Sequence, residues 1–182
     1  MNKQWYVTWF ESSWYRELYS HRTIDEAKTA VSLVETMNLP KGSRILDLCC
    51  GAGRHAAALA EQGFIVTGID YSEYLINVAR SEYGAMSHLH LYRCDMRENY
   101  PNKPFDAIVN FFTSFGYFDT DEENAAVIVN IADSLNDNGY FLLDYLNAEY
   151  IKKNILQKFP LKIDVSVTIA KQKHNQSDKI QN

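Results

Sequence analysis

The sequence predicts an α/β fold, a doubly wound and mainly parallel sheet with helices on both faces. Five short apolar runs alternate with segments of helical periodicity. Each run is continuously apolar, as is typical of strands buried on both faces. Glycines, prolines and helix-capping residues separate the segments. With 182 residues, 46% of them hydrophobic, the chain is expected to form one domain with a sizeable core.

The expected elements follow in regular order from Thr23. Thr23 and Glu26 form a capping box before a helix that runs to about Asn38. The five strands are expected at 44–49, 65–70, 89–95, 105–112 and 140–146. Helices are expected at 54–62 and 72–83 and, after a second capping box at Thr120 and Glu123, up to about residue 136.

The two ends of the chain differ from this core. The first twenty residues hold three tryptophans and three tyrosines, which favours packing onto the rest of the protein. Residues 147–159 are predicted to be helical, and from Leu161 to Ile169 apolar and polar residues alternate, as in a strand with one solvated face. We therefore expect an N-terminal helical segment (1–39), the α/β core (40–147), and a C-terminal region with a polar tail (148–182).

Composition narrows the classes of function. A net charge of −5 provides no basic surface for general nucleic-acid binding. No apolar run is long enough for a membrane span, and the start of the sequence is unlike a signal peptide, so a cytoplasmic protein is expected. Cys49, Cys50 and Cys94 form no CxxC pair, so we expect buried thiols in a reducing compartment and no metal site.

Polar residues gather where the predicted strands end, which is the edge at which open parallel sheets bind ligands. Asp47 and a turn containing Gly51 and Gly53 belong to the first strand, and Asp70 and Asp95 end the second and third. The glycines allow a ligand close to the backbone, and the following helix offers free N–H groups to an anion.

Two cofactors compete for this edge. GAGRHA matches the G-x-G-x-x-G/A dinucleotide fingerprint, and Asp70 lies 19 residues after Gly51, where an acid would hold a ribose. However, a pyrophosphate would meet the like charges of Asp47 and Asp95. S-adenosylmethionine has a sulfonium and an ammonium that favour acids, a carboxylate that favours the helix N-terminus, and a ribose diol and an adenine amino group that favour acceptors.

In chain order, residues 40 to 147 resemble the class I S-adenosylmethionine-dependent methyltransferases. ILDLCCGAGRHAAALA is similar to the cofactor loop of that family, although Cys49 stands at the first glycine position. VTGIDYSEYLINVAR resembles the ribose-binding strand and helix, RCDM the adenine turn, FDAIVNFFTSFGYF the fourth strand and ADSLNDNGYFLLDYL the fifth. LYSHR followed by DEAK is similar to an N-terminal segment that folds over the cofactor in small bacterial members. The resemblance implies a Rossmann-like fold.

The resemblance also implies roles at the methionyl and ribose end of S-adenosylmethionine. Asp47 would approach the ammonium, and Cys49, Gly51 and Gly53 would contact the methionyl part through their backbone. Asp70 would accept hydrogen bonds from the ribose hydroxyls. A purely structural hydrogen bond from the turn to Asp47 remains an alternative.

Four further residues are implied at the adenine end and beside the ammonium. Tyr71 would lie along adenine, Asp95 would accept a hydrogen bond from its amino group, and Met96 would donate its backbone N–H to the ring. Asn110 would hold the ammonium through its carbonyl.

Several other residues have two open interpretations. Tyr15, Tyr19 and Arg22 either cover the cofactor and pair with its carboxylate or pack onto the helix at 24–38. The remaining set is aromatic and lies after the fourth strand, where it either forms an acceptor wall or is simply core: Phe111, Phe112, Phe115, Tyr117 and Phe118.

The leading function is methyl transfer to a small-molecule acceptor. The first alternative is a non-catalytic S-adenosylmethionine-binding domain or truncated remnant, and the second is an NAD(P)-dependent reductase. The catalytic residue stays unknown, since methyl transfer needs a general base only for a protonated, weak acceptor. His55 and Tyr117 are the nearest candidates, and a cap or core role for His55 is the alternative.

The C-terminal strands are expected to be incomplete. The family resembled here ends its sheet with two further strands, whereas one alternating strand follows Leu146. We expect either that this strand folds back onto the fifth strand or that a second copy covers the edge in a homodimer. A shortened acceptor side should leave activity low or absent while cofactor binding persists.

Overall fold

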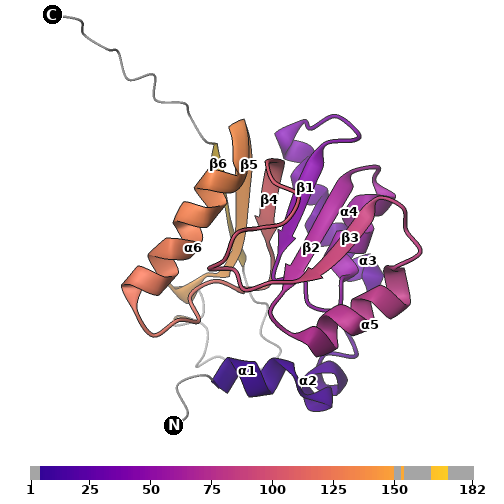
Figure 1. Ribbon diagram of the computed structural model, residues 1–182, viewed down its shortest axis with the longest axis vertical. Helices are drawn as coiled ribbons and strands as arrows, with labels where there is room; N and C mark the ends of the chain where they lie inside the picture. The colour runs from indigo at the N-terminus through magenta and orange to yellow at the C-terminus, as the bar shows by residue number, and fades with distance from the viewer. Residues whose placement is uncertain (1–4, 150–152, 154–164, 172–182) are drawn as a thin grey trace, which may run out of the picture.

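The computed structural model describes residues 5–149, 153 and 165–171. One sheet forms the centre of the molecule and helices lie on both of its faces (Figure 1). In chain order, the elements are α1 Trp5–Phe10, α2 Ser13–Leu18, α3 Ile24–Val31, the 3₁₀ helix η1 Ser32–Met37, β1 Arg44–Leu48, α4 Arg54–Glu61, β2 Ile65–Asp70, α5 Glu73–Tyr83, β3 Leu89–Arg93, β4 Phe105–Asn110, α6 Asp121–Ser134, β5 Leu135–Leu146 and β6 Val165–Lys171.

The sheet has the order β3-β2-β1-β4-β5-β6, so the strand order reverses between β1 and β4. The first five strands of this order are parallel to one another, and β6 is antiparallel to β5. This confirms the predicted α/β class and places the reversal point beside the loop after β1.

Two hydrophobic cores lie on the two faces of the sheet. Ile45 and Val109 pack with residues of α3, α4 and α5, whereas Leu46 and Ile108 pack with residues of α6. Neighbouring residues thus enter different cores because side chains alternate along a strand. The continuous apolar runs in the sequence result from burial on both sides.

The element boundaries differ from the sequence prediction in several places, and β3 ends at Arg93 rather than at residue 95. The predicted helix at 24–38 is α3 followed by η1, with Thr23 capping α3 as expected. β4 ends at Asn110 rather than at residue 112, because Phe112 and Thr113 have φ of 61° and 55°, which are incompatible with a strand. β5 begins at Leu135, directly after α6, and not at residue 140.

The alternating C-terminal segment folds back onto the fifth strand. Tyr140 of β5 pairs with Lys171 of β6, and Leu146 pairs with Val165. The first of the two expected alternatives is therefore confirmed, and β5 needs no second copy to cover this edge. Low activity of the chain stays a prediction, and the helix expected at 147–159 falls largely outside the described residues.

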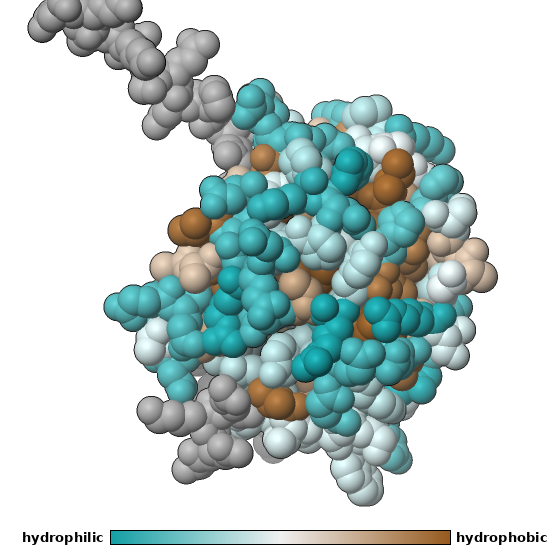
Figure 2. All heavy atoms as spheres, in the orientation of Figure 1, coloured by the Kyte–Doolittle hydropathy of each residue, from teal (hydrophilic) through white to brown (hydrophobic). Residues whose placement is uncertain are grey.

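The helices α1 and α2, with the turn at residues 11–12 between them, form an N-terminal cap (Trp5–Leu18). In Figure 1 the cap lies below the carboxyl ends of β1 and β2. On the face shown in Figure 2, hydrophobic residues form separate patches among hydrophilic ones. Within the described ranges, no helix is long and apolar enough to cross a membrane.

Candidate functional site

The loop after β1 passes close to the end of β2. The Gly51 N–H donates to Asp70 Oδ2 over 2.9 Å, and the Ser72 N–H donates to Asp70 Oδ1, also over 2.9 Å. Burial raises the pKa of Asp70, and these hydrogen bonds partly oppose the shift. Each carboxylate oxygen has a second acceptor site, so the geometry leaves capacity for a diol.

Gly51 and Gly53, the two glycines of the loop, have different structural roles. Gly51 has φ of 55°, and a Cβ added there would meet no atom within 4 Å. A Cβ at Gly53, where φ is 83°, would lie 2.9 Å from the Cβ of Ala79. Gly51 thus keeps the backbone open to a ligand, whereas Gly53 lets the start of α4 pack against α5.

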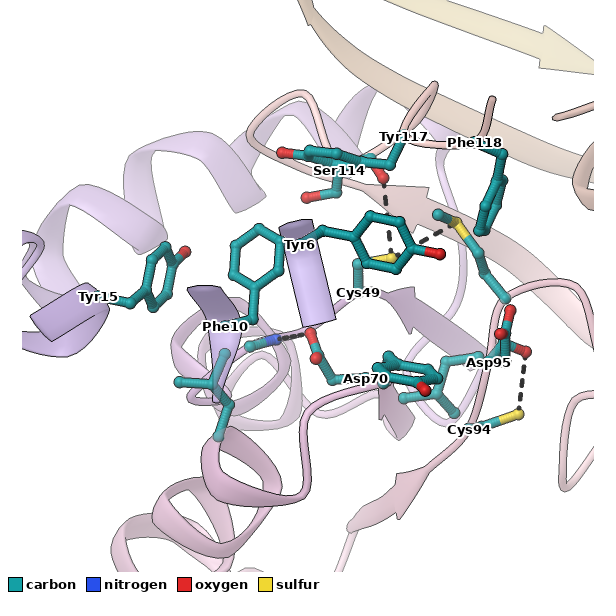
Figure 3. A pocket seen from close by; sticks show the side chains of 15 residues that line it. Tyr6, Phe10, Tyr15, Cys49, Asp70, Cys94, Asp95, Ser114, Tyr117 and Phe118 are labelled. Carbon is teal, nitrogen blue, oxygen red and sulfur yellow. Dashed lines mark hydrogen bonds between the residues drawn. The ribbon is translucent and has the colours of Figure 1, made fainter. Parts of the chain in front are cut away.

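A pocket of about 90 Å³ opens over this loop (Figure 3). Six of the nine sequence-predicted cofactor residues line it: Cys49, Gly51, Asp70, Tyr71, Asp95 and Met96. Asp47, Gly53 and Asn110 line neither this pocket nor the larger cavity beside it. The carboxyl ends of the strands therefore bring together most, but not all, of the predicted cofactor-binding residues.

Asp47 lies beneath the loop, on the same face of β1 as Ile45. It is 1% exposed and accepts a hydrogen bond from the backbone N–H of Ala56 in α4. Burial and then the nearby charge of Asp70 raise the pKa of Asp47 to about 7. Asp47 lines neither cavity, but its buried Oδ2 has no hydrogen-bond partner among the described residues, so the structural hydrogen bond from the turn and the contact with a cofactor ammonium both stay predictions.

Asn110 joins the two strands at the reversal point. Its Nδ2 donates to the backbone oxygen of Leu48 over 2.8 Å, while its buried Oδ1 has no hydrogen-bond partner among the described residues. The side chain therefore fixes the spacing between the ends of β1 and β4.

Asp95 is held by Arg97, which the sequence analysis did not single out. Asp95 Oδ2 accepts from Arg97 Nη2 over 2.6 Å, and Oδ1 accepts from Arg97 Nε over 3.0 Å. Burial opposes ionisation of Asp95, but these hydrogen bonds outweigh it and lower the pKa. Arg97 also pairs with Glu123 and lies over the Phe118 ring. Arg97 thus orients the Asp95 carboxylate even without a bound adenine. The arginine two residues after the acid could have indicated this ion pair from the sequence.

Sulfur atoms and aromatic rings form much of the pocket wall. Cys49 Sγ lies 3.7 Å from Met96 Sδ and 3.9 Å from the backbone oxygen of Ser114. Tyr71 is 37% exposed at the rim, with the Arg93 guanidinium 5.5 Å from the centre of its ring. Burial raises the pKa of the Cys49 thiol well above its usual value, so Cys49 is a poor nucleophile.

The N-terminal cap completes the pocket. Tyr6, Phe10 and Tyr15 line it, and their rings point into the space over Asp70 in Figure 3. Burial and then the charge of Asp70 raise the pKa of Tyr15 to about 12. The aromatic density of the first twenty residues predicted packing, and Tyr15, Tyr19 and Arg22 were the expected covers. Tyr15 lines this pocket, Tyr19 and Arg22 line only the larger cavity beside it, and Tyr6 and Phe10 were not expected.

A larger cavity of about 630 Å³ adjoins the pocket, shares Cys49, Gly51 and Tyr117 with it, and lies between the cap and the turn after β4. Arg22 and Arg54 line it, with their guanidinium carbons 4.7 and 5.9 Å from the centre of the Phe112 ring. The cavity therefore combines aromatic walls with two positive charges.

Neither candidate base is well suited to remove a proton. Burial, followed by repulsion from Arg54, lowers the pKa of His55 to about 3, and its ring stacks on Phe111 with centres 4.7 Å apart. Burial raises the pKa of Tyr117. His55 is thus an uncharged packing residue that accepts a proton poorly, and the site favours chemistry without a strong general base.

The sequence is similar to those of known methyltransferases. The family described as "Methyltransferase domain" matches residues 45–139. YqeM of Bacillus subtilis (strain 168), which carries a methyltransferase name, is 34% identical over 73% of this chain and 53% of its own length. The dTDP-3-amino-3,4,6-trideoxy-alpha-D-glucopyranose N,N-dimethyltransferase of Streptomyces venezuelae is 29% identical over 65% of this chain and 48% of its own.

Solved structures agree on the fold. SAM-bound CalS10, an amino pentose methyltransferase from Micromonospora echinaspora, has a TM-score of 0.60 and 25% identity, covering 72% of this chain and 56% of that one. A TehB-like SAM-dependent methyltransferase from Corynebacterium glutamicum has a TM-score of 0.66 and 20% identity, covering 88% and 94%.

The chain spans about half the length of the curated relatives it matches. The family match nevertheless covers more than half of this chain, from β1 to the bulged first part of β5. Strands β2 to β4, nearly all of β1, the glycine loop after β1 and the acids that end β2 and follow β3 fall within it. On this match, the chain belongs to the methyltransferase domain family.

Proposed function

We propose that the protein binds S-adenosylmethionine and transfers its methyl group to a small-molecule acceptor. The observation that carries the proposal is the position of Asp70, which ends β2 in the pocket wall while its carboxylate holds the backbone of Gly51. The carboxylate of Asp70 thus contacts the turn that would receive the methionyl part and also lies where the ribose would bind.

The charges of the pocket support this cofactor over a dinucleotide. Asp70 and Asp95 both line the pocket, and Arg97, the nearest cation to Asp95, is already held by Asp95 and Glu123. An acidic wall repels a pyrophosphate but attracts a sulfonium and an ammonium. The dinucleotide fingerprint and the two arginines beside Gly51 would also suit a pyrophosphate, but the family match supports methyl transfer over the reductase.

The adjoining cavity is where we propose that the acceptor binds. Its size lies within the range of about 300–1,000 Å³ typical of small-ligand sites, and it meets the cofactor pocket at Cys49 and Tyr117. The Streptomyces venezuelae relative is named as acting on a nucleotide-linked amino sugar, which supports a small-molecule acceptor here. All three cysteines are free thiols, which supports a reducing, cytoplasmic location.

Bound S-adenosylmethionine would supply a methyl group already activated by its sulfonium. The protein then has to orient and enclose the reactants, and orientation alone is worth up to about 7–11 kcal/mol of barrier. Asp70 and the Gly51 turn would hold the cofactor, and the rings of Tyr6 and Phe10 would exclude water from it. Tyr117 lines both cavities and lies where the acceptor would meet the cofactor. A neutral amine acceptor can lose its proton to water after the transfer, whereas a hydroxyl acceptor would need a base.

Thermal-shift and calorimetric titrations with S-adenosylhomocysteine and with NADH test the cofactor. We expect S-adenosylhomocysteine alone to raise the melting temperature, because a ligand that binds only the folded state stabilises it. A shift with NADH alone would overturn the proposal. Screening acceptors for release of S-adenosylhomocysteine, with amino sugars and aromatic acids as the first set, then tests the transfer.

A further inference from the structure

Glu11, in the turn between α1 and α2, binds the N-terminus of another helix. Its Oε1 accepts the Glu73 N–H over 2.8 Å, and its Oε2 accepts the Tyr74 N–H over 3.3 Å. These residues open α5, an eleven-residue helix whose first N–H groups have no partner within the helix. A carboxylate there also interacts favourably with the helix dipole.

A second hydrogen bond fastens the cap at the same turn. Ser72 Oγ donates to the backbone oxygen of Phe10 over 2.9 Å, and the Ser72 N–H donates to Asp70. Asp70 in turn holds Gly51. Residues 70–74 therefore both attach the cap and contain Asp70, the residue proposed to bind the ribose.

The cap has few other means of attachment. Neither α1 nor α2 contains a buried residue. Arg16 and Glu82 form an ion pair at the surface, where both side chains are well exposed. The remaining described contacts are between rings at the pocket mouth, such as Tyr6 with Phe118 and Trp5 with Tyr117.

The rings of the cap also occupy space that a cofactor would need. The pocket beneath Tyr6 and Phe10 measures about 90 Å³, which is well below the size typical of small-ligand sites. Phe10 and Tyr15 also line the larger cavity, so movement of the cap would widen the space beside Asp70 and its connection to that cavity.

We infer that Glu11 is a positioning residue that latches the cap over the pocket, and that release of this latch controls how fast ligand enters and leaves. The ligand part of this inference rests on the proposed function, because it takes S-adenosylmethionine as the occupant. The latch itself rests only on the contacts of Glu11 within the protein.

The three tryptophans, Trp5, Trp9 and Trp14, all lie in the cap, and Trp9, at 36% exposed, is the one whose exposure can increase most when the cap opens. The variants are Glu11→Ala, Glu11→Gln, which keeps an acceptor oxygen, and Glu17→Ala, a control on α2 whose carboxylate makes no described contact with α5. Acrylamide quenching of the free protein measures exposure of the cap. Stopped-flow tryptophan fluorescence measures the release of S-adenosylhomocysteine.

We expect Glu11→Ala to increase quenching and to speed S-adenosylhomocysteine release by about two- to fivefold, the scale of an exposed carboxylate at a helix N-terminus. Glu11→Gln should lie between it and the wild type, and Glu17→Ala should match the wild type. The melting temperature of the free protein should change little because the cap buries no residue of its own.

Equal quenching and equal release rates for Glu11→Ala and Glu17→Ala would overturn the latch. If the wild type failed to bind S-adenosylhomocysteine while Glu11→Ala still increased quenching, the proposed function would fail and the latch would stand. The free-protein measurement thus separates the two failures.

Discussion

Asp144 of β5 accepts the backbone N–H of Phe112 through Oδ2 over 3.1 Å and so fixes the turn that follows β4. The backbone oxygen of Asp144 accepts the Thr113 N–H over 3.0 Å, and Thr113 Oγ1 accepts the Leu146 N–H. Phe112 and Thr113 both have positive φ, which is uncommon for a bulky and for a β-branched residue. A strained turn in the wall of the larger cavity is therefore held by the neighbouring strand.

Replacing Asp144 should relax this turn. Asp144→Ala is expected to lower the free energy of unfolding by about 1–2 kcal/mol, because the Phe112 N–H loses a charged acceptor in a half-buried position. Asp144→Asn keeps an acceptor oxygen and should lose less. Urea unfolding measures both variants, and identical midpoints for Asp144→Ala and the wild type would contradict a role for this contact.

Asp70→Ala should weaken binding of S-adenosylhomocysteine by about 2–4 kcal/mol, since hydrogen bonds to a charged acceptor are worth about 1.5–3 kcal/mol each and do not add fully. The structure adds a second expectation, a lower free energy of unfolding, because Gly51 and Ser72 lose their acceptor. Calorimetric titration of folded protein decides the first point. An unchanged dissociation constant would remove Asp70 from the site.

Cys49→Gly should preserve or improve cofactor affinity. Cys49 has φ of 65°, a conformation in which a side chain is strained and glycine is not. The opposing effect is loss of the contact with Met96. Titration with S-adenosylhomocysteine checks the expectation, with Cys50→Ala as the matched thiol control. Loss of turnover in Cys50→Ala, with cofactor binding intact, would instead indicate a nucleophilic role for that thiol.

Two buried groups should give opposite pH dependences of stability. Asp47 has a pKa of about 7 in the folded protein against about 3.9 when unfolded, so the free energy of unfolding falls as pH rises between these values. His55 has a folded pKa of about 3 against about 6.5, so the free energy of unfolding rises with pH over that window. Between about pH 4 and 6.5 the two effects offset each other.

Single variants should separate these slopes. Relative to the wild type, Asp47→Asn should make the free energy of unfolding rise more steeply with pH, and His55→Phe should make it rise less or fall, each by up to about 1.4 kcal/mol per pH unit, while the raised pKa of Asp70 acts equally in both. Denaturant unfolding at several pH values provides the measurement. Parallel pH profiles for both variants would show that these pKa shifts are not present.

Local sequence patterns were sufficient to predict the order of helices and strands and the edge of the sheet where the site lies. Thr23 and Thr120 cap their helices as their spacing indicated, and the acids that close or follow short apolar strands, Asp70 and Asp95, do meet in one pocket. These features depend on neighbours in sequence and on the rule that parallel strands end at one edge.

Features that depend on distant contacts could not be predicted. Asp47 lies one residue inside its strand, and the alternation that places Ile45 against α4 also turns Asp47 beneath the loop. The early end of β4 requires Asp144, which is 32 residues beyond Phe112. The cover provided by Tyr6 and Phe10 depends on Glu11 reaching α5, and no periodicity in the sequence indicates that contact.

Enclosure by the cap has a consequence for which molecules could be modified. The larger cavity, at about 630 Å³, holds roughly the volume of twenty water molecules, so it could take a sugar or an aromatic ring system with short substituents. A folded protein or a nucleic-acid duplex would have to extend a single thin group into this cavity to reach Tyr117. The two helices that would keep water away from the methyl group thus also limit the size of the acceptor. Any part of an acceptor that does not fit in the cavity would have to extend out through its opening.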